Sequence, residues 1–220
     1  MSAPPLVPNR LYGLRTWTAV GAQGDERLAG PQRGTVWPAD GGWLAAGCSE
    51  PHTAPAPACR CGIHAWHPGR HGARQMLRPR WEIPGVVEAE GTIELHQDGF
   101  RAARGRPYAL FVAPNANASL IGRLAEVYGA ELVHVDDAEG VCAWCATRGL
   151  GLAQDVVERL IGPERLAAER GARRRRARRT ALRLASVAVV IAALIGAGLA
   201  VTSDPGDRSL YGRTGEVERR

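Results

Sequence analysis

The feature that most constrains this chain is a stretch of nineteen residues at 184–202, LASVAVVIAALIGAGLAVT, which contains no charged residue. As a helix it would rise about 28 Å, roughly the hydrocarbon thickness of a bilayer. Lipid offers no hydrogen-bonding partner to the backbone, so a helix is the form that such a segment takes in a membrane. The sequence therefore predicts a single C-terminal transmembrane helix over 184–202. A buried core helix is the alternative.

An arginine-rich segment, 163–183, directly precedes this stretch and predicts its orientation. Arginines beside a span stay on the cytoplasmic side. We therefore expect a single-pass plasma-membrane protein with a cytoplasmic N-terminus and a short external tail at 203–220. The same charges favour contact with anionic lipid headgroups. The flanking arginines are Arg173, Arg174, Arg175, Arg176, Arg178, Arg179 and Arg183.

The distribution of charge argues against nucleic-acid binding, although the net charge is +6. Residues 1–163 hold 15 arginines and 16 acidic residues, whereas residues 164–183 hold nine arginines and two glutamates. The positive charge thus belongs to one short segment and not to the face of a domain, as a nucleic-acid footprint requires.

Small residues recur every four positions within 184–202, at Ala188, Ala192, Gly196 and Ala200. A helix face of small side chains allows two helices in lipid to approach closely. This pattern predicts weak self-association through the transmembrane helix. The alternative is that it reflects only the high alanine content of the chain.

The segments before the arginines predict an α+β domain at 11–162, after a flexible arm at 1–10. Alternating apolar residues indicate strands at 11–20 and 86–96, and Gln97-Asp98-Gly99 indicates a turn into a returning strand. A helix is expected between Asn117 as N-cap and Gly129 as terminator. Further helical patterns occupy 149–161 and begin again at Pro163. Strands therefore come before most helices, which favours a mainly antiparallel sheet.

Cysteine and histidine residues gather in the irregular segment 48–72. Cys48, His52, Cys59 and Cys61 lie within fourteen residues and supply three thiols and one imidazole, a common ligand set of structural zinc. A loop without apolar periodicity also needs such a staple. His64, His67 and His71 follow as substitute ligands. The alternatives are one all-cysteine site formed with Cys142 and Cys145, an iron–sulfur cluster, or unliganded thiols.

Cys142 and Cys145 form a Cys-x-x-Cys pair after an expected strand and before an expected helix. A helix N-terminus lowers a thiol pKa, so the pair is a candidate redox site. The acidic run at 136–139 would act in the opposite direction. Buried core thiols are the simpler interpretation.

Several of these motifs together resemble an uncharacterised domain of actinobacterial proteins. The motifs are GLRTW, TVWP, Cys48 and HTAPAPACRCGIHAW, followed by GTIELHQDGFRAARGRPYALFV with an arginine after the turn. The resemblance covers about residues 11–135, and His64 stands where the pattern has tyrosine. It implies that His52 belongs with Cys48, Cys59 and Cys61, and it carries no function.

Two functional hypotheses follow. The first is a non-enzymatic, membrane-anchored module with a structural zinc site that binds an unidentified cytoplasmic protein. The second is a membrane-tethered thiol sensor or enzyme that uses Cys142 and Cys145.

Overall fold

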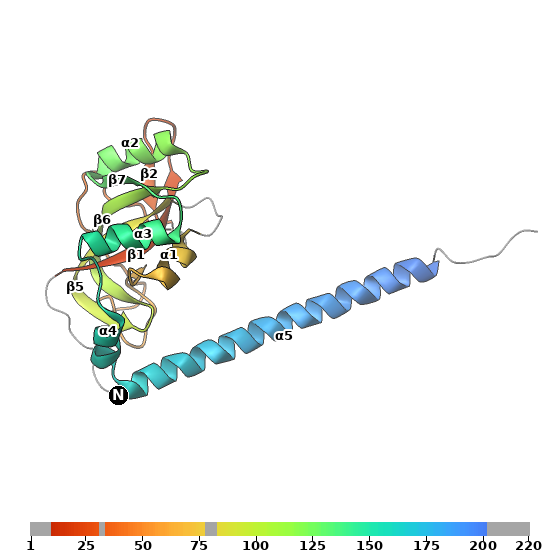
Figure 1. Ribbon diagram of the computed structural model, residues 1–220. Coiled ribbons are helices and arrows are strands. Elements are labelled where there is room, and N and C mark those ends of the chain that lie inside the picture. Colours follow the sequence, from red (N-terminus) through yellow and green to blue (C-terminus); the bar gives the residue numbers. More distant parts are fainter. Residues whose placement is uncertain (1–9, 31–33, 78–82, 202–220) are drawn as a thin grey trace, which may run out of the picture. The chain divides into compact units, whose positions relative to one another are not determined.

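The computed structural model describes residues 10–30, 34–77 and 83–201, with the side chains of 183, 189, 190 and 192–201 excepted. The chain divides into two compact units, Met1–Glu169 and Arg170–Arg220 (Figure 1). The strands are β1 (Arg10–Val20), β2 (Arg27–Ala29), β3 (Leu44–Ala45), β4 (Ile63–Trp66), β5 (Ile83–His96), β6 (Gly99–Val112) and β7 (Glu131–His134). The helices are α1 (Arg70–Met76), α2 (Ala118–Tyr128), α3 (Ala138–Thr147), α4 (Gln154–Ile161) and α5 (Pro163–Val201).

The strands of the first unit form one mixed sheet that closes on itself. β1 pairs with β5, β5 with β6, β6 with β4, and β4 returns to β1 through Leu14 and Trp66. All these pairings are antiparallel, and the pairing of β6 with β7 is parallel. The α+β class with a mainly antiparallel sheet is therefore confirmed.

The β5–β6 hairpin is the scaffold of this sheet. Its turn lies where Gln97-Asp98-Gly99 predicts it, with His96 opposite Gly99. A Cβ atom at Gly99 would lie 2.0 Å from the carbonyl oxygen of Ala65, so only glycine permits β4 to approach β6 here. Register shifts at Val86/Val87 and at Glu90/Ile93 interrupt the hairpin. Such bulges bend and twist a strand, which helps one hairpin to reach both β1 and β4.

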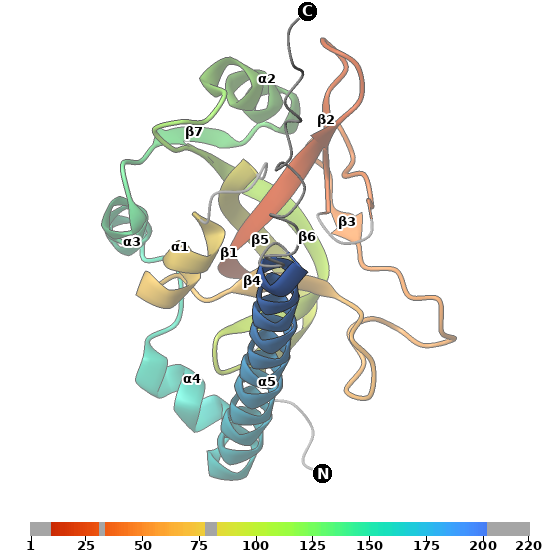
Figure 2. The same cartoon turned by 90° about the vertical axis from the view of Figure 1, so that its right-hand side faces the viewer.

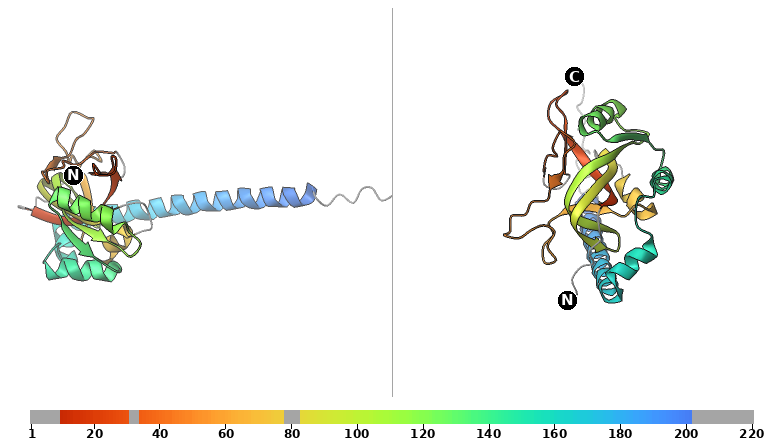
Figure 3. Two further views of the ribbon diagram at one scale, coloured as in Figure 1. Left: turned by 90° about the horizontal axis from the view of Figure 1, so that it is seen from above. Right: turned by 90° about the vertical axis from the view of Figure 1, so that its left-hand side faces the viewer.

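The two faces of the sheet build two apolar cores, because side chains alternate along each strand. Trp17, Val87 and Phe100 belong to the larger core, inside the closed ring. Leu14 and Phe111 point to the opposite face, where α1 and α3 cover them. Figures 2 and 3 show these two helices together on one side of the sheet.

The predicted helix starts and stops are only partly correct. As expected, Asn117 caps the N-terminus of α2, where its side chain accepts the N–H of Leu120, and left-handed Gly129 caps the C-terminus. α4 is shorter than 149–161 and buries Val157 and Ile161. The segment 48–72 is not wholly irregular, since it contains β4 and the start of α1.

The predicted transmembrane helix requires a correction. Within the described part of the chain, no helix is both long enough and apolar enough to cross a membrane. This finding contradicts the predicted transmembrane helix at 184–202 and, with it, the fold class that included this helix. One continuous helix, α5, carries the arginines from Pro163 onward, and its described side chains are rich in charge. The side chains of Arg183, Ala192, Gly196 and Ala200, and the whole tail 203–220, lie outside the described residues.

Candidate metal centre

The four predicted ligands lie in the connection between β3 and β4, on the side of the sheet away from α3 (Figures 2 and 3). The connection is fastened at its start by the N–H of Ala46, which donates to the carbonyl oxygen of Ala103 at 2.7 Å. Ala54 and Pro55 are buried, whereas most other residues of 48–60 are partly or fully exposed. Apolar burial therefore contributes little to the order of this loop, so interactions of its polar groups must stabilise its conformation.

Cys48, His52, Cys59 and Cys61 come together as the sequence predicts. Their candidate ligand atoms all lie within 4.8 Å of one another. The Sγ atom of Cys48 lies 3.4 Å from Nε2 of His52 and 3.6 Å from Sγ of Cys59. Ordinary zinc bond lengths in a regular tetrahedron give edges of about 3.6 Å between sulfur and nitrogen and about 3.8 Å between two sulfurs. The four groups thus fit around one metal ion.

Backbone groups next to the ligands support the same arrangement. The N–H of Glu50 donates to Sγ of Cys48 at 3.4 Å, a contact that stabilises a thiolate. Nδ1 of His52 lies 3.3 Å from the carbonyl oxygen of Thr53. A metal-bound histidine commonly donates its second ring N–H to a backbone carbonyl, which fixes the ring. Nε2 then remains to face Cys48, although Nδ1 also lies 3.9 Å from Sγ of Cys61.

The protonation of the ligands is set by their mutual contacts. Hydrogen bonds from the backbone of Cys61 and from Cys48 lower the pKa of Cys59 to about 6. Burial raises the pKa of Cys61. The hydrogen bond with Cys59 raises the pKa of His52. Cys59 is therefore deprotonated more readily than Cys61, which lowers the cost of binding a cation through its sulfur.

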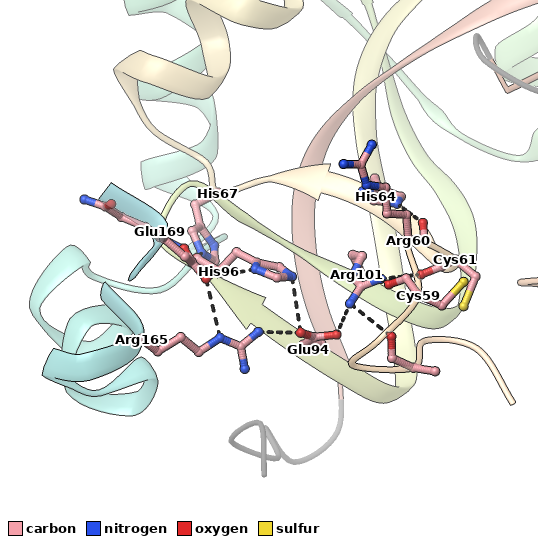
Figure 4. Close-up of polar contacts among 12 residues, drawn as sticks. Cys59, Arg60, Cys61, His64, His67, Glu94, His96, Arg101, Arg165 and Glu169 are labelled. Carbon is pink, nitrogen blue, oxygen red and sulfur yellow. Dashed lines mark hydrogen bonds and ion pairs between the residues drawn. The ribbon is translucent and has the colours of Figure 1, made fainter. Parts of the chain in front are cut away.

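Arg101 of β6 holds the ligand loop from the sheet side, as Figure 4 shows. Its guanidinium donates to the carbonyl oxygens of Cys59, Cys61 and Ala56, the latter two at 3.1 and 3.4 Å. The side chain is 7% exposed, so these carbonyls replace its water. Sequence reasoning did not assign Arg101 to the site, although it is the first arginine after the β5–β6 turn and the resemblance includes an arginine there.

Cys142 and Cys145 do not join this cluster. They lie inside α3, neither before it nor at its N-cap, which is Asp137. Cys145 is 2% exposed and packs in the core under α3. Burial raises the pKa of Cys145 to about 12, and burial followed by the charge of Glu139 raises that of Cys142. Both thiols therefore stay protonated at neutral pH, which disfavours a nucleophilic role.

The three following histidines have other surroundings. Nε2 of His64 lies 2.9 Å from the carbonyl oxygen of Arg60, and Nε2 of His67 lies 2.9 Å from that of His96. His71 lies in α1. None of the three belongs to the group of candidate ligands found among the described residues.

Comparison with protein-family models, with curated protein sequences and with solved structures gave no match. The resemblance to the actinobacterial domain thus stays a prediction. The four-residue cluster is supported by its own geometry alone.

Proposed function

We propose that this protein is a zinc-stabilised binding module, in which one structural zinc ion folds the 48–61 loop. The observation that carries the proposal is the close grouping of three thiols and one imidazole, whose candidate ligand atoms all lie within 4.8 Å of one another. A catalytic zinc keeps one position open for water or substrate, whereas four protein ligands close the shell. The site therefore favours a structural role over catalysis.

Zinc suits the ligand set better than an iron–sulfur cluster does. Thiolates on different irons of a cluster stand further apart than the ligands of a single ion, whereas all four candidate ligand atoms here lie within 4.8 Å of one another. Sγ of Cys48 and Sγ of Cys59 are 3.6 Å apart. His52 also supplies a nitrogen, which is common in structural zinc sites.

The loop that the metal would fold is the proposed binding surface. Pro57, Ala58 and Arg60 are exposed on it. Loops held by a rigid scaffold are frequent sites of recognition, and a metal lowers the entropy that a free loop would lose on binding. The partner that these features suit is another protein.

Metal content tests the first part of this proposal. The purified full chain should contain one zinc ion per molecule. Replacement by cobalt should give the absorption bands of a tetrahedral thiolate site, and Cys61→Ser should abolish them. A chain that holds no metal after refolding with zinc would overturn the proposal.

Site-specific crosslinking tests the second part. A photoreactive residue at Ala58, in cells that express the full chain, should give a crosslinked protein that disappears in the Cys61→Ser background. The same group at Glu126, an exposed residue of α2, is the matched control. Equal crosslinking from both positions, or crosslinking at Ala58 that survives Cys61→Ser, would contradict the role of the loop.

A further inference from the structure

A chain of charged side chains, buried at Arg101 and Glu94 and partly exposed at Arg165 and Glu169, leads from the ligand loop to the beginning of α5 (Figure 4). At the loop end, Nη2 of Arg101 donates to Oε2 of Glu94, and the two side chains are 7% and 5% exposed. The other guanidinium contacts of Arg101 go to loop carbonyls, as described above. Arg101 therefore joins the loop to one oxygen of Glu94.

The second oxygen of Glu94 joins the first two turns of α5. Arg165 donates to Oε1 of Glu94, and Nε2 of His96 lies 3.6 Å from the same oxygen. Glu169 accepts the backbone N–H of Gln97 at 2.8 Å and lies 3.0 Å from Nδ1 of His96. Leu166, between Arg165 and Glu169, is buried in the larger core. Residues 163–169 are thus fastened to the β5–β6 turn within the first unit.

Glu94 is the residue that contacts both Arg101 at the ligand loop and Arg165 at the start of α5. A buried carboxylate needs all its partners, because an unpaired charge in a dry site is costly. Its two oxygens accept hydrogen bonds from two different arginines. A rotation of the carboxylate that follows one arginine therefore changes the geometry of the ion pair with the other. The carbonyl oxygens of Cys59 and Cys61, both contacted by Nη1, help to fix the orientation of Arg101. Those carbonyls belong to the residues that would hold the metal.

We infer that metal binding by the Cys48–Cys61 loop and the docking of residues 163–169 are energetically coupled through Arg101, Glu94 and Arg165. The inference rests on the proposed metal site. A bound ion fixes the loop carbonyls, the carbonyls fix Arg101, and Arg101 presents Glu94 to Arg165. Coupling between two sites is reciprocal, so a change in the docking of residues 163–169 must alter metal affinity by the same factor as the metal alters their docking.

Zinc affinity of the full chain, measured by competition with a chelator, tests one direction. Arg165→Ala should weaken zinc binding by about fivefold or more, the lower range of measured couplings. Arg165→Lys keeps the charge and should recover part of the loss. Arg159→Ala removes an exposed i,i+4 pair with Asp155 in neighbouring α4, and it should leave the affinity unchanged.

Amide hydrogen exchange of the wild-type full chain tests the other direction and needs no variant at α5. Removal of zinc by a chelator should speed amide exchange in residues 164–169 and at the N–H of Gln97, whereas α2 should change little. In Cys61→Ser, added zinc should have no effect on these amides. These results together would support the coupling.

The failures of the two proposals are distinguishable. Suppose that the wild-type chain binds zinc, that Arg165→Ala binds it equally well, and that removal of the metal does not change amide exchange in residues 164–169. The coupling is then wrong, and the metal site is still supported. If the wild-type chain binds no zinc, the proposed function is wrong and the coupling falls with it.

Discussion

Tyr128 and Trp37 are joined by a buried hydrogen bond, in which the Tyr128 hydroxyl donates to the Trp37 carbonyl oxygen at 3.0 Å. The same hydroxyl accepts the backbone N–H of Leu28 at 3.0 Å. One side chain at the end of α2 thus satisfies two backbone groups about ninety to a hundred residues away in the sequence. It fastens α2 to β2 and to the segment that follows it.

Removal of this hydroxyl should destabilise the first unit. Tyr128→Phe leaves a buried N–H and a buried carbonyl without their partner, and we expect a loss of about 1–3 kcal/mol in the free energy of unfolding. Urea denaturation of the full chain measures it. Tyr108→Phe is the control, because Tyr108 is partly exposed and water can replace lost contacts. Equal losses from the two variants would show that the bridge contributes nothing of its own.

Zinc should stabilise the wild-type chain by an amount that rises with the logarithm of the free zinc concentration above the Kd. A ligand that binds only the folded state at 100 times its Kd adds about 2.7 kcal/mol to the free energy of unfolding. Cys61→Ser should lose this dependence. Cys145→Ser should keep it, even if it lowers stability by altering the core under α3. Thermal unfolding over a series of free zinc concentrations provides the measurement. If both variants lose the stabilisation by zinc, the alternative all-cysteine site with Cys142 and Cys145 is supported instead.

The five thiols should differ in their reactivity. All are free of disulfides. In metal-free protein at neutral pH, iodoacetamide should modify Cys59 first, since its pKa lies at about 6. Cys145, whose pKa is raised to about 12 by burial, should react only on unfolding. Peptide mass spectrometry over time gives the order, and fast modification of Cys142 or Cys145 would support the thiol-sensor hypothesis instead.

Stability should fall in mild acid partly through His67. Burial lowers the pKa of this histidine below its ordinary value of 6.5, despite the contact with the His96 carbonyl. The unfolded chain therefore binds more protons in this range, so the stabilising contribution is complete above about pH 6.5 and is lost as the pH falls through the folded-state pKa. His67→Gln can keep a donor towards the carbonyl but does not titrate.

Comparison of two unfolding curves isolates this contribution. The metal ligands also titrate in this range, but at one zinc concentration they contribute equally to wild type and to His67→Gln. We expect the free energy of unfolding to depend less on pH in the variant between about pH 7 and 5. Parallel curves for the two proteins would show that His67 is not responsible.

The sequence by itself determined the features that depend on neighbouring residues. Alternation placed β1 and the β5–β6 hairpin, and Asn117 and Gly129 bounded α2. Three cysteines and one histidine within fourteen residues defined the candidate metal loop. Each is a local property, since strand pleat, helix caps and a short chelating loop need no distant partner.

Only the tertiary structure decided which distant groups meet. Arg101 contacts the carbonyl oxygen of Cys59 across 42 positions, and Arg165 contacts Glu94 across 71. Strand register and helix docking fix such pairs, and a local pattern does not contain them. The burial of Cys145 is also a tertiary result, because it comes from the packing of α3 on the sheet. The start of α3 before Cys142 is instead local, since Asp137 caps it. A charge-free stretch likewise predicted a span, and the described part of α5 does not supply one. Local sequence thus limits which secondary structure and ligands a segment can offer, whereas the packing of the folded chain decides which residues it contacts and which of its side chains are buried.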